Sequence, residues 1–250
     1  MTVLDQFRLD GKVALVTGAN RGLGAAIAEA LAEAGASVVV TARKASAANG
    51  AAEHLRRREG FHAWGVELDV TDAASIVKGV DLATELAGEI DILVNNAGVG
   101  TIWSAFDTPD DGWAETFATN VDGVWNCARV VAEKMRARGT GVIVNVGSVG
   151  GSMVLRKPQA AYMASKAAVH QLTRALAVEW AEYGIRVNAV APGPFLTEMT
   201  EPDQPEYMDR LPLRRYGLPD ELGPAVVFLA SPGAAFITGE ILTVDGGVSL

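Results

Sequence analysis

The chain has 250 residues, 49% of them hydrophobic, and its formal net charge at pH 7 is −9. This length favours one α/β domain over two small ones and supplies enough residues for a sizeable core. The acidic balance argues against a nucleic-acid partner, which would need a basic face, but it does not exclude an anionic cofactor held by a few local groups.

The composition also restricts the compartment and the kind of site. No apolar run reaches the roughly 20 residues that span a bilayer, and MTVLDQFRLDGK at the start does not resemble a secretory signal. Cys127 is the only cysteine, which excludes an internal disulfide and a multi-cysteine metal site. The three histidines lack metal-ligand spacing, so no metal is expected. We expect a cytoplasmic protein with no membrane segment.

Apolar strands and helical segments alternate from one end of the chain to the other. Strands are predicted over 12–17, 37–42, 61–68, 90–95, 141–147, 185–191 and 237–244, and helices over 21–34, 45–59, 72–88, 110–138, 160–183 and 220–229. This alternation is typical of a parallel sheet covered on both faces. Right-handed crossovers then give a single doubly wound α/β domain over residues 1–250.

Several residues mark the ends of these elements. Gly35 and Gly184 are placed to end helices in the left-handed conformation, and Asp110 or Asp111 is placed to cap the helix over 110–138. The stretch 192–219 carries six prolines and no regular pattern. Since irregular segments this long are usually functional or disordered, we interpret it as a lid over the substrate.

The segment TGANRGLG, residues 17–24, lies between the first predicted strand and the first helix. Glycines let the backbone turn tightly and approach a pyrophosphate, and the start of a helix favours negative charge. A glycine trio alone is a weak signal, but here both flanking elements are present. The expected cofactor contacts in this loop are Gly18, Asn20, Arg21, Gly22, Leu23 and Gly24.

The end of the second predicted strand indicates which dinucleotide is bound. An NAD site usually has an acidic side chain there for the ribose 2′-hydroxyl, whereas this chain has Thr41-Ala42-Arg43-Lys44. The guanidinium of Arg43 suits a 2′-phosphate, and Arg21 can approach the same group. We therefore expect NADP, with NAD as the alternative; a solvated surface charge is the other interpretation of each arginine.

A second group of residues points to proton transfer. Tyr162 and Lys166 are four positions apart on one predicted helix and therefore lie on one face. Tyrosine has a pKa of about 10, and a nearby ammonium group favours its ionised form. Ser148 at the end of the fifth predicted strand can hydrogen-bond a substrate oxygen. A tyrosine–lysine pair alone is weak, because helices carry such pairs for solvation.

Taken together, these motifs resemble the short-chain dehydrogenase/reductase family in its single-domain form. The resemblance covers essentially the whole chain, and the order and spacing of the motifs are more specific than any one of them. The matching pieces are TGANRGLG at 17–24, DV at 69–70, NNAG at 95–98, Asn120, Ser148, YMASK at 162–166, PGPFLT at 192–197 and VDGG at 244–247. One extra residue in the loop between Ser148 and Tyr162 departs from the commonest spacing and puts the substrate in doubt more than the chemistry.

The resemblance implies roles for the matching residues. Tyr162 would be the general acid and base, Lys166 would lower its pKa and bind the nicotinamide ribose, and Ser148 would position the substrate carbonyl. Asn120 would hold a water that links Lys166 to solvent. The remaining expected cofactor contacts are Asp69 and Val70 at the adenine, Asn95, Ala97 and Gly98 near the adenosine ribose, and Pro192, Gly193 and Thr197 beside the nicotinamide.

Three functions stay open at this stage. The stretch 157–193 resembles dehydrogenases of polyols, sugars and sugar acids, for which short polar residues near the site would suit hydroxyl-rich substrates. A 3-oxoacyl-thioester reductase acting on acyl carrier protein shares the motifs and would need a basic patch near the mouth of the site, for which Arg129, Arg136 and Arg138 are candidates. A non-catalytic NAD(P)-binding regulator is the third, and the intact Ser148, Tyr162 and Lys166 argue against it.

Residues outside these motifs receive plainer interpretations. His170, one turn after Lys166, is expected to face a neighbouring subunit rather than to act in catalysis, and Trp103 is expected either to line the substrate pocket or to pack at its rim. The resemblance implies a homotetramer in which the helices carrying Asn120 and Tyr162, and the segment 237–250, pack against symmetry mates.

Overall fold

The computed structural model of the chain describes residues 2–100, 102–155, 158–197 and 211–250. The strands are β1 Val13–Val16, β2 Ser37–Ala42, β3 Ala63–Glu67, β4 Ile92–Asn95, β5 Gly141–Val146, β6 Ile185–Pro192 and β7 Ile241–Val244. The α-helices are α1 Gly22–Glu33, α2 Ala45–Arg56, α3 Ala73–Ala87, α4 Asp110–Phe117, α5 Gly123–Arg138, α6 Ala160–Trp180 and α8 Gly223–Ala230. Short 3₁₀ turns cover Leu4–Phe7, Val149–Gly151, Ala181–Tyr183, Pro219–Glu221 and Pro232–Ala234.

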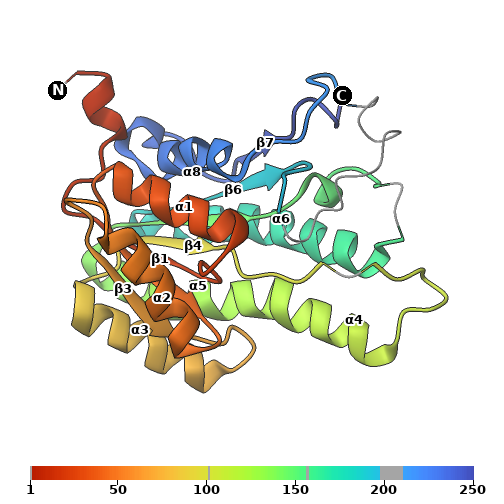
Figure 1. The fold of residues 1–250 in the computed structure, drawn as a ribbon, viewed down its shortest axis with the longest axis horizontal. Coiled ribbons are helices and arrows are strands. Elements are labelled where there is room, and N and C mark those ends of the chain that lie inside the picture. Colours follow the sequence, from red (N-terminus) through yellow and green to blue (C-terminus); the bar gives the residue numbers. More distant parts are fainter. Residues whose placement is uncertain (1, 101, 156–157, 198–210) are drawn as a thin grey trace.

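All seven strands form one parallel sheet in the order β3-β2-β1-β4-β5-β6-β7. The chain builds outward from β1 to β3, returns to the centre, and builds outward again from β4 to β7 (Figure 1). A ligand crevice opens at such a reversal, between the carboxyl ends of β1 and β4. The predicted single doubly wound domain is confirmed.

Alternate residues of each strand supply two separate cores. Val38 and Val40 of β2 join the core formed with α1, α2 and α8, whereas Val39 joins the core formed with α3, α5 and α6. Figure 1 shows α3 and α5 along one side of the sheet, with α1 and α8 along the other. Because both faces are covered, the strands are mostly apolar on both faces, which is why they could be predicted from the sequence.

Most elements match within a few residues, and the larger differences from the predictions are in the second half of the chain. The single helix expected over 110–138 is divided into α4 and α5 by a π-helical turn over Ala118–Asp122. Neither Asp110 nor Asp111 caps α4, because the N-cap position is Pro109, which has no side-chain hydrogen bond. The last predicted helix begins as the 3₁₀ turn Pro219–Glu221, and the last strand covers only Ile241–Val244.

The described ends of the predicted lid, 192–219, lie against each other. The amide of Leu196 donates to the carbonyl of Gly217 at 2.9 Å, and the amide of Gly217 donates to the carbonyl of Pro194 at 3.0 Å. Residues 198–210 lie outside the described part of the chain, so the lid stays a prediction. Within the described ranges, no helix combines the length and apolar character that crossing a membrane requires.

Candidate active site

A cavity of about 420 Å³ opens at the carboxyl ends of the central strands. It is formed by the loops after β1, β2, β3, β4, β5 and β6 together with the first turn of α6. The predicted site residues that line it are Gly18, Asn20, Arg21, Gly22, Leu23, Arg43, Asp69, Val70, Ala97, Gly98, Ser148, Tyr162, Lys166, Pro192, Gly193 and Thr197. The structure therefore brings both the predicted phosphate end and the predicted chemical end into one cavity.

The glycine loop after β1 has the shape of an anion cradle. Gly18 and Gly22 have positive φ angles of 62° and 56°, which glycine adopts without strain. A Cβ at Gly22 would meet no atom within 4 Å, so this position is open toward the cavity that it lines. Helix α1 begins at Gly22 with no side-chain cap, which leaves the amide groups of its first turn for a ligand. These residues fit a bound pyrophosphate.

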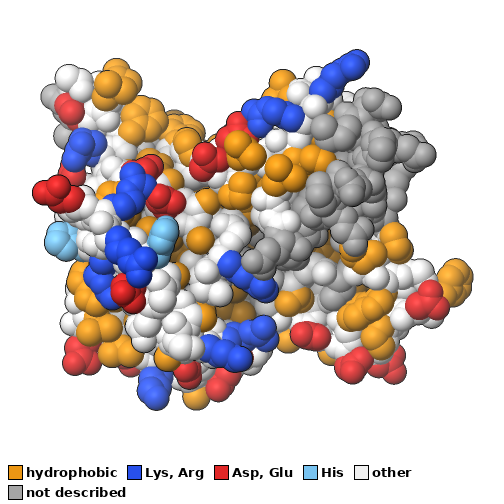
Figure 2. All heavy atoms as spheres, viewed as in Figure 1, with side chains coloured by type: hydrophobic (Ala, Val, Ile, Leu, Met, Phe, Trp, Pro, Cys, Tyr) orange, Lys and Arg blue, Asp and Glu red, His pale blue; other side chains and the backbone are white. Residues whose placement is uncertain are grey.

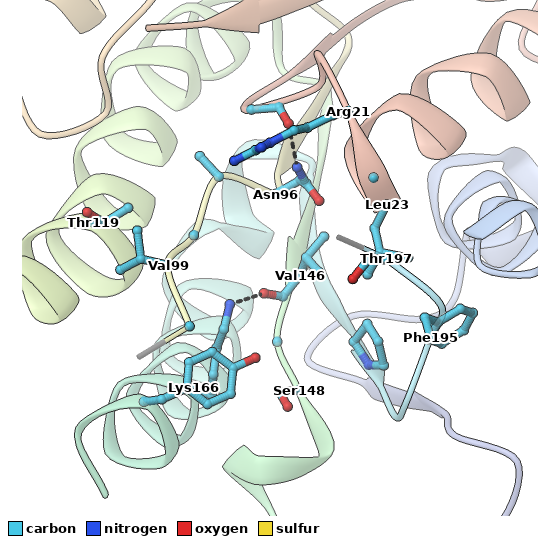
Figure 3. A pocket seen from close by; sticks show the side chains of 18 of the residues that line it. Arg21, Leu23, Asn96, Val99, Thr119, Val146, Ser148, Lys166, Phe195 and Thr197 are labelled. Atoms are coloured by element: carbon cyan, nitrogen blue, oxygen red, sulfur yellow. Dashed lines mark hydrogen bonds between the residues drawn. The ribbon is translucent and has the colours of Figure 1, made fainter. Parts of the chain in front are cut away.

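Two polar residues that were not predicted as site residues brace this loop against the loop after β4. The Oγ1 atom of Thr17 accepts from the amides of Asn96 and Ala97, both at 3.0 Å. The side-chain nitrogen of Asn96 donates to the carbonyls of Thr17 at 2.9 Å and Gly18 at 3.1 Å (Figure 3). Their signal in the sequence was a polar residue at the carboxyl end of each of two central strands.

Gly24 and Asn95 support the cavity from behind rather than line it. A Cβ at Gly24 would lie 2.3 Å from the side-chain nitrogen of Asn96 and 2.6 Å from the carbonyl oxygen of Gly18, so only glycine lets α1 approach the loop. Asn95 is buried, and its side-chain nitrogen donates to the side-chain oxygen of Asn145 on β5 at 2.9 Å. Both residues are structural parts of the crevice, and neither reaches the space where a cofactor would lie.

Arg43 follows β2 at the edge of the cavity, as expected for a group that meets the adenosine end of a dinucleotide. A carboxylate that the sequence did not draw attention to lies close by. Glu67, the last residue of β3, is paired in register with Ala42, and its Oε2 accepts from the amide of Ala45 at the start of α2 at 3.1 Å. Arg43 and Glu67 thus place opposite charges on adjacent strand ends.

Ser148, Tyr162 and Lys166 line the other end of the cavity, where β5 ends and α6 begins. Figure 3 shows Ser148 and Lys166 there. The Oγ atom of Ser148 accepts from the amide of Gly150 at 3.1 Å. The Nζ atom of Lys166 donates to the carbonyl of Val146 at 2.9 Å and lies 5.7 Å from the centre of the Tyr162 ring. The two α6 residues lie one helical turn apart, as their spacing predicted.

Burial controls the protonation of this group in the chain as it stands. It raises the pKa of Tyr162, and the hydrogen bond with Ser148 opposes this as the smaller effect. It lowers the pKa of Lys166 to about 8. Burial therefore acts against the depressed tyrosine pKa that the family resemblance implies. Neutral tyrosine beside a largely protonated lysine is a proton donor ready for a carbonyl oxygen.

Asn120 lies in the π-helical turn between α4 and α5 and does not line the cavity. Its side chain is fully buried and ties three segments together. The Oδ1 atom accepts from the amide of Val99 at 2.8 Å, and the Nδ2 atom donates to the Val99 carbonyl at 2.9 Å and to Ser165 Oγ at 3.0 Å. Asn120 thereby fixes the loop after β4 against α6 directly behind Lys166.

The cavity has more apolar lining than a hydroxyl-rich substrate led us to expect. Its described lining residues that were not predicted include Ile102, Val149, Leu155, Gln159, Pro194, Phe195 and Tyr216. Trp103 is not among the residues that line the cavity and packs on α4 instead, since a Cβ at Gly112 would lie 2.3 Å from its ring. The alternative that Trp103 packs outside the pocket is therefore the one observed.

Comparisons with known proteins agree with this geometry. A model of the family described as Enoyl-(Acyl carrier protein) reductase matches residues 18–249. The chain is 46% identical to galactitol 2-dehydrogenase (L-tagatose-forming) of Cereibacter sphaeroides over 98% of its length and 97% of the relative. It is 42% identical to a 3-oxoacyl-[acyl-carrier-protein] reductase of Vibrio harveyi, with 96% and 98% covered.

Among solved structures, a gluconate 5-dehydrogenase from Burkholderia cenocepacia in complex with NADP and tartrate is similar throughout. It superposes with a TM-score of 0.95, is 41% identical, and 99% of each chain is covered. A dinucleotide cradle, a serine–tyrosine–lysine group and full-length relatives at this identity lead to one conclusion. The chain belongs to the short-chain dehydrogenase/reductase family and is an NAD(P)-dependent oxidoreductase similar in sequence to polyol and sugar-acid dehydrogenases.

Proposed function

We propose that this enzyme interconverts a secondary alcohol of a polyol and the corresponding ketone, with NADP(H) as its preferred cofactor. The observation that carries the proposal is the convergence of Ser148, Tyr162 and Lys166 with the glycine loop on one cavity. The bound nicotinamide would supply the hydride for reduction of the carbonyl or accept it in the reverse direction. The protein's part is to position the substrate oxygen and to move its proton.

The side chains at the end of β5 and the start of α6 supply that proton transfer. The substrate oxygen would receive a hydrogen bond from Ser148 Oγ and the proton of Tyr162 Oη during reduction, and in oxidation Tyr162 would take the proton back. Burial raises the pKa of Tyr162 and so favours its protonated form before transfer. The positive charge of Lys166 favours the tyrosinate that forms after transfer, because opposite charges close together stabilise each other in a buried site.

Arg43 supports the choice of NADP(H) over NAD(H). Arg43 directly follows β2 and lines the cavity. The 2′-phosphate of an adenosine ribose bound there would make charge-assisted hydrogen bonds with its guanidinium. Arg21 also lines the cavity and would add positive charge near the phosphate. Glu67 at the next strand end carries the opposite charge and would moderate the preference, so that NAD(H) is a weaker cofactor and not an excluded one.

Charge around Ser148 favours a neutral polyol over a sugar acid. Among the described residues that line the cavity, the cations are Arg21, Arg43 and Lys166, and Figure 3 shows Arg21 far from Ser148 in the view. Lys166 donates to the Val146 carbonyl and faces Tyr162, so the described residues that line the cavity offer no further cation for a substrate carboxylate. Gln159 supplies amide hydrogen-bonding groups that suit a hydroxyl.

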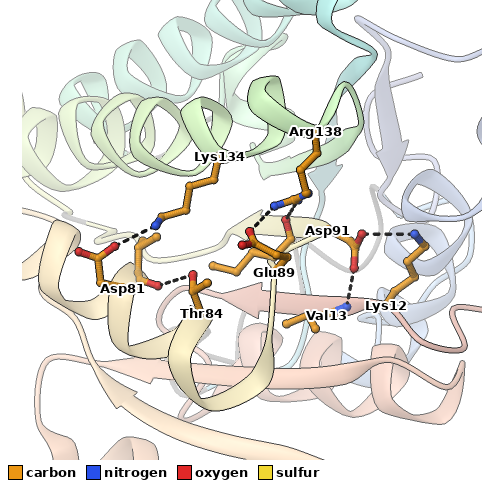
Figure 4. A network of polar contacts seen from close by, with 10 residues as sticks. Lys12, Val13, Asp81, Thr84, Glu89, Asp91, Lys134 and Arg138 are labelled. Carbon is orange, nitrogen blue, oxygen red and sulfur yellow. Dashed lines mark hydrogen bonds and ion pairs between the residues drawn. The ribbon is translucent and has the colours of Figure 1, made fainter.

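The carrier-protein alternative has weaker structural support. The basic patch suggested for it, on α5, does not lie at the mouth of the cavity. Arg138 forms an ion pair with Glu89 at 2.5 Å and donates to the Ile90 carbonyl at 2.6 Å, just before β4 at the amino end of the sheet (Figure 4). Arg136 lies over the ring of Tyr183. On the face drawn in Figure 2, the described basic side chains form small groups beside acidic ones.

We also propose that the enzyme is a homotetramer. Trp125 and Trp180 line a groove between α5 and α6, and Val178 on α6 is 80% exposed. Near the C-terminus, Phe236 and Leu250 are fully exposed. Apolar residues concentrated on these two surfaces are typical of subunit contacts. Light scattering after size exclusion tests this, and a mass near the 26.1 kDa of one chain would contradict it.

The decisive experiment follows reduced nicotinamide by its absorbance. In the oxidative direction, NADP⁺ and NAD⁺ are offered with galactitol, threitol and gluconate; in the reductive direction, NADPH and NADH are offered with L-tagatose and a 3-oxoacyl thioester. The proposal expects NADP⁺-dependent oxidation of a neutral polyol that is lost in Tyr162→Phe. Turnover of gluconate but of no neutral polyol would contradict the substrate class, and turnover of the thioester alone would favour the carrier-protein alternative.

A further inference from the structure

The side chain of His170 lies against the loop that carries Ser148, on the side away from the cavity. It is on α6 one turn after Lys166 and is only 2% exposed, so it does not face a neighbouring subunit as the sequence suggested. The backbone amide of Ser148 donates to Nε2 at 3.5 Å, and Nδ1 lies 3.1 Å from Ser152 Oγ. One imidazole ring therefore touches both ends of the turn Val149–Gly151.

These partners determine which tautomer the ring adopts. A backbone amide can only donate, so Nε2 must be the unprotonated nitrogen, and the proton of a neutral ring is then on Nδ1 and is donated to Ser152 Oγ. Two cations act on the ring, Lys166 from the preceding turn of α6 and Arg174 from the following turn. Burial, as the largest effect, and these two charges lower the pKa of His170 to about 4, which keeps the ring neutral.

Two glycines of the serine loop make room for the ring. A Cβ at Gly147 would lie 2.4 Å from Nε2 of His170, and a Cβ at Gly151 would lie 2.7 Å from its Cε1. Each is closer than real Cβ atoms approach, so the ring packs directly on the backbone before and after Ser148. The ring can pack this closely only because the loop has glycine at positions 147 and 151.

We propose that His170 is a positioning residue for the reaction, which holds the backbone of Ser148 so that its Oγ points toward the substrate oxygen. The inference rests on the proposed role of Ser148. Ser148 lies where β5 ends and the short turn begins, and its own side chain accepts from Gly150. The Nε2 atom of His170 accepts from the backbone amide of Ser148 and so holds the main chain of the same residue. A shift of about 1 Å in a catalytic group can cost on the order of 100-fold in rate.

Two substitutions separate the contacts of the ring. In His170→Gln, the side-chain oxygen reaches the position of Nε2 and keeps an acceptor for the Ser148 amide. In His170→Asn, the shorter amide reaches the position of Nδ1, keeps a partner for Ser152, and leaves the Ser148 amide without its acceptor. We expect kcat to fall about 10- to 100-fold in His170→Asn and to be largely retained in His170→Gln, with the dissociation constant of NADPH unchanged in both.

The matched controls are Ser152→Ala and Ser148→Ala. Ser152→Ala removes only the partner of Nδ1 and should leave kcat close to that of the parent enzyme. Equal losses in the Gln and Asn variants, or no loss in either, would overturn the positioning role. Ser148→Ala tests the underlying function: if it keeps full turnover, the proposed role of the serine fails, whatever the His170 variants do.

A measurement on the unaltered enzyme keeps the inference testable if the variants fold poorly. Nitrogen-15 NMR of labelled histidine distinguishes the two tautomers and the protonated ring. We expect one histidine with protonated Nδ1 and unprotonated Nε2 throughout the neutral range. If the His170 signals instead show protonated Nε2, or a doubly protonated ring at pH 7, the ring cannot accept from Ser148, and the inference is wrong.

Discussion

Replacing His170 with glutamine should change how the stability of the enzyme depends on pH. Histidine has an ordinary pKa of 6.5, and in the folded chain burial and the charges of Arg174 and Lys166 lower the pKa of His170 to about 4. Between these values the unfolded chain binds a proton that the folded chain does not. The parent enzyme therefore loses stability as the pH falls from about 6.5 toward 4, and glutamine, which does not titrate, removes this loss.

The size of the effect follows from the two pKa values. The difference between the unfolded-state and folded-state pKa values corresponds to about 3 kcal/mol of unfolding free energy, and the whole of this loss is reached only below pH 4. Between pH 7 and pH 5, the linkage relation gives a loss of about 2 kcal/mol for the parent from this residue alone. His170 is 2% exposed, so solvent screening takes little from this figure.

Urea unfolding of the parent and of His170→Gln at pH 7 and pH 5, at one protein concentration, measures the difference. The carboxylates and the exposed His54 and His62 are common to both proteins, so their contributions cancel. The stability of His170→Gln relative to the parent should rise by about 2 kcal/mol on going to pH 5. Parallel pH dependence in the two proteins would refute the buried neutral ring, and a relative gain for the parent at pH 5 would mean that the folded state binds the proton.

Three further changes test the site. Tyr162→Phe should lower kcat by about 100- to 10,000-fold while NADPH still binds in a fluorescence titration; retained turnover would remove Tyr162 from proton transfer. Arg43→Ala should weaken NADPH binding by at least about tenfold and leave NADH binding unchanged, whereas equal losses would contradict contact with the 2′-phosphate. Gly147→Ala should destabilise the fold by about 1–3 kcal/mol through the clash with His170, while Gly50→Ala, with open space at its Cβ in α2, should be neutral or stabilising in the same thermal unfolding experiment.

The elements that could be predicted from the sequence are those whose local pattern and tertiary environment agree. The strands are apolar on both faces because helices cover both faces, and the glycines at 35 and 184 do adopt positive φ where helices end. The break in the helix over 110–138 could not be predicted, because its apolar spacing continues through the π-helical turn. That turn depends on hydrogen bonds from Asn120 to Val99 and Ser165, which come from distant parts of the chain.

The same distinction applies to the site. Ser148, Tyr162 and Lys166 could be proposed from spacing and family resemblance, and the fold brings them to one cavity. Thr17 and Asn96 lie in the quoted motifs TGANRGLG and NNAG, but their role was missed because they join two loops across the reversal in strand order, and the motifs do not show which groups pair. His170 was placed outward because helical spacing alone does not reveal which face of a long helix the serine loop covers.

The structure also limits how Asn120 can serve the lysine. Both hydrogens of its side-chain amide are taken, one by the Val99 carbonyl and one by Ser165, and its oxygen accepts from the Val99 amide. A water that linked Lys166 to solvent through this residue could not accept a hydrogen bond from the side-chain nitrogen without breaking one of these bonds. The π-helical turn changes the local pattern of backbone hydrogen bonds at this position. The side-chain amide hydrogens of Asn120 thus hold the turn in shape, and its oxygen keeps one lone pair that could accept from a water.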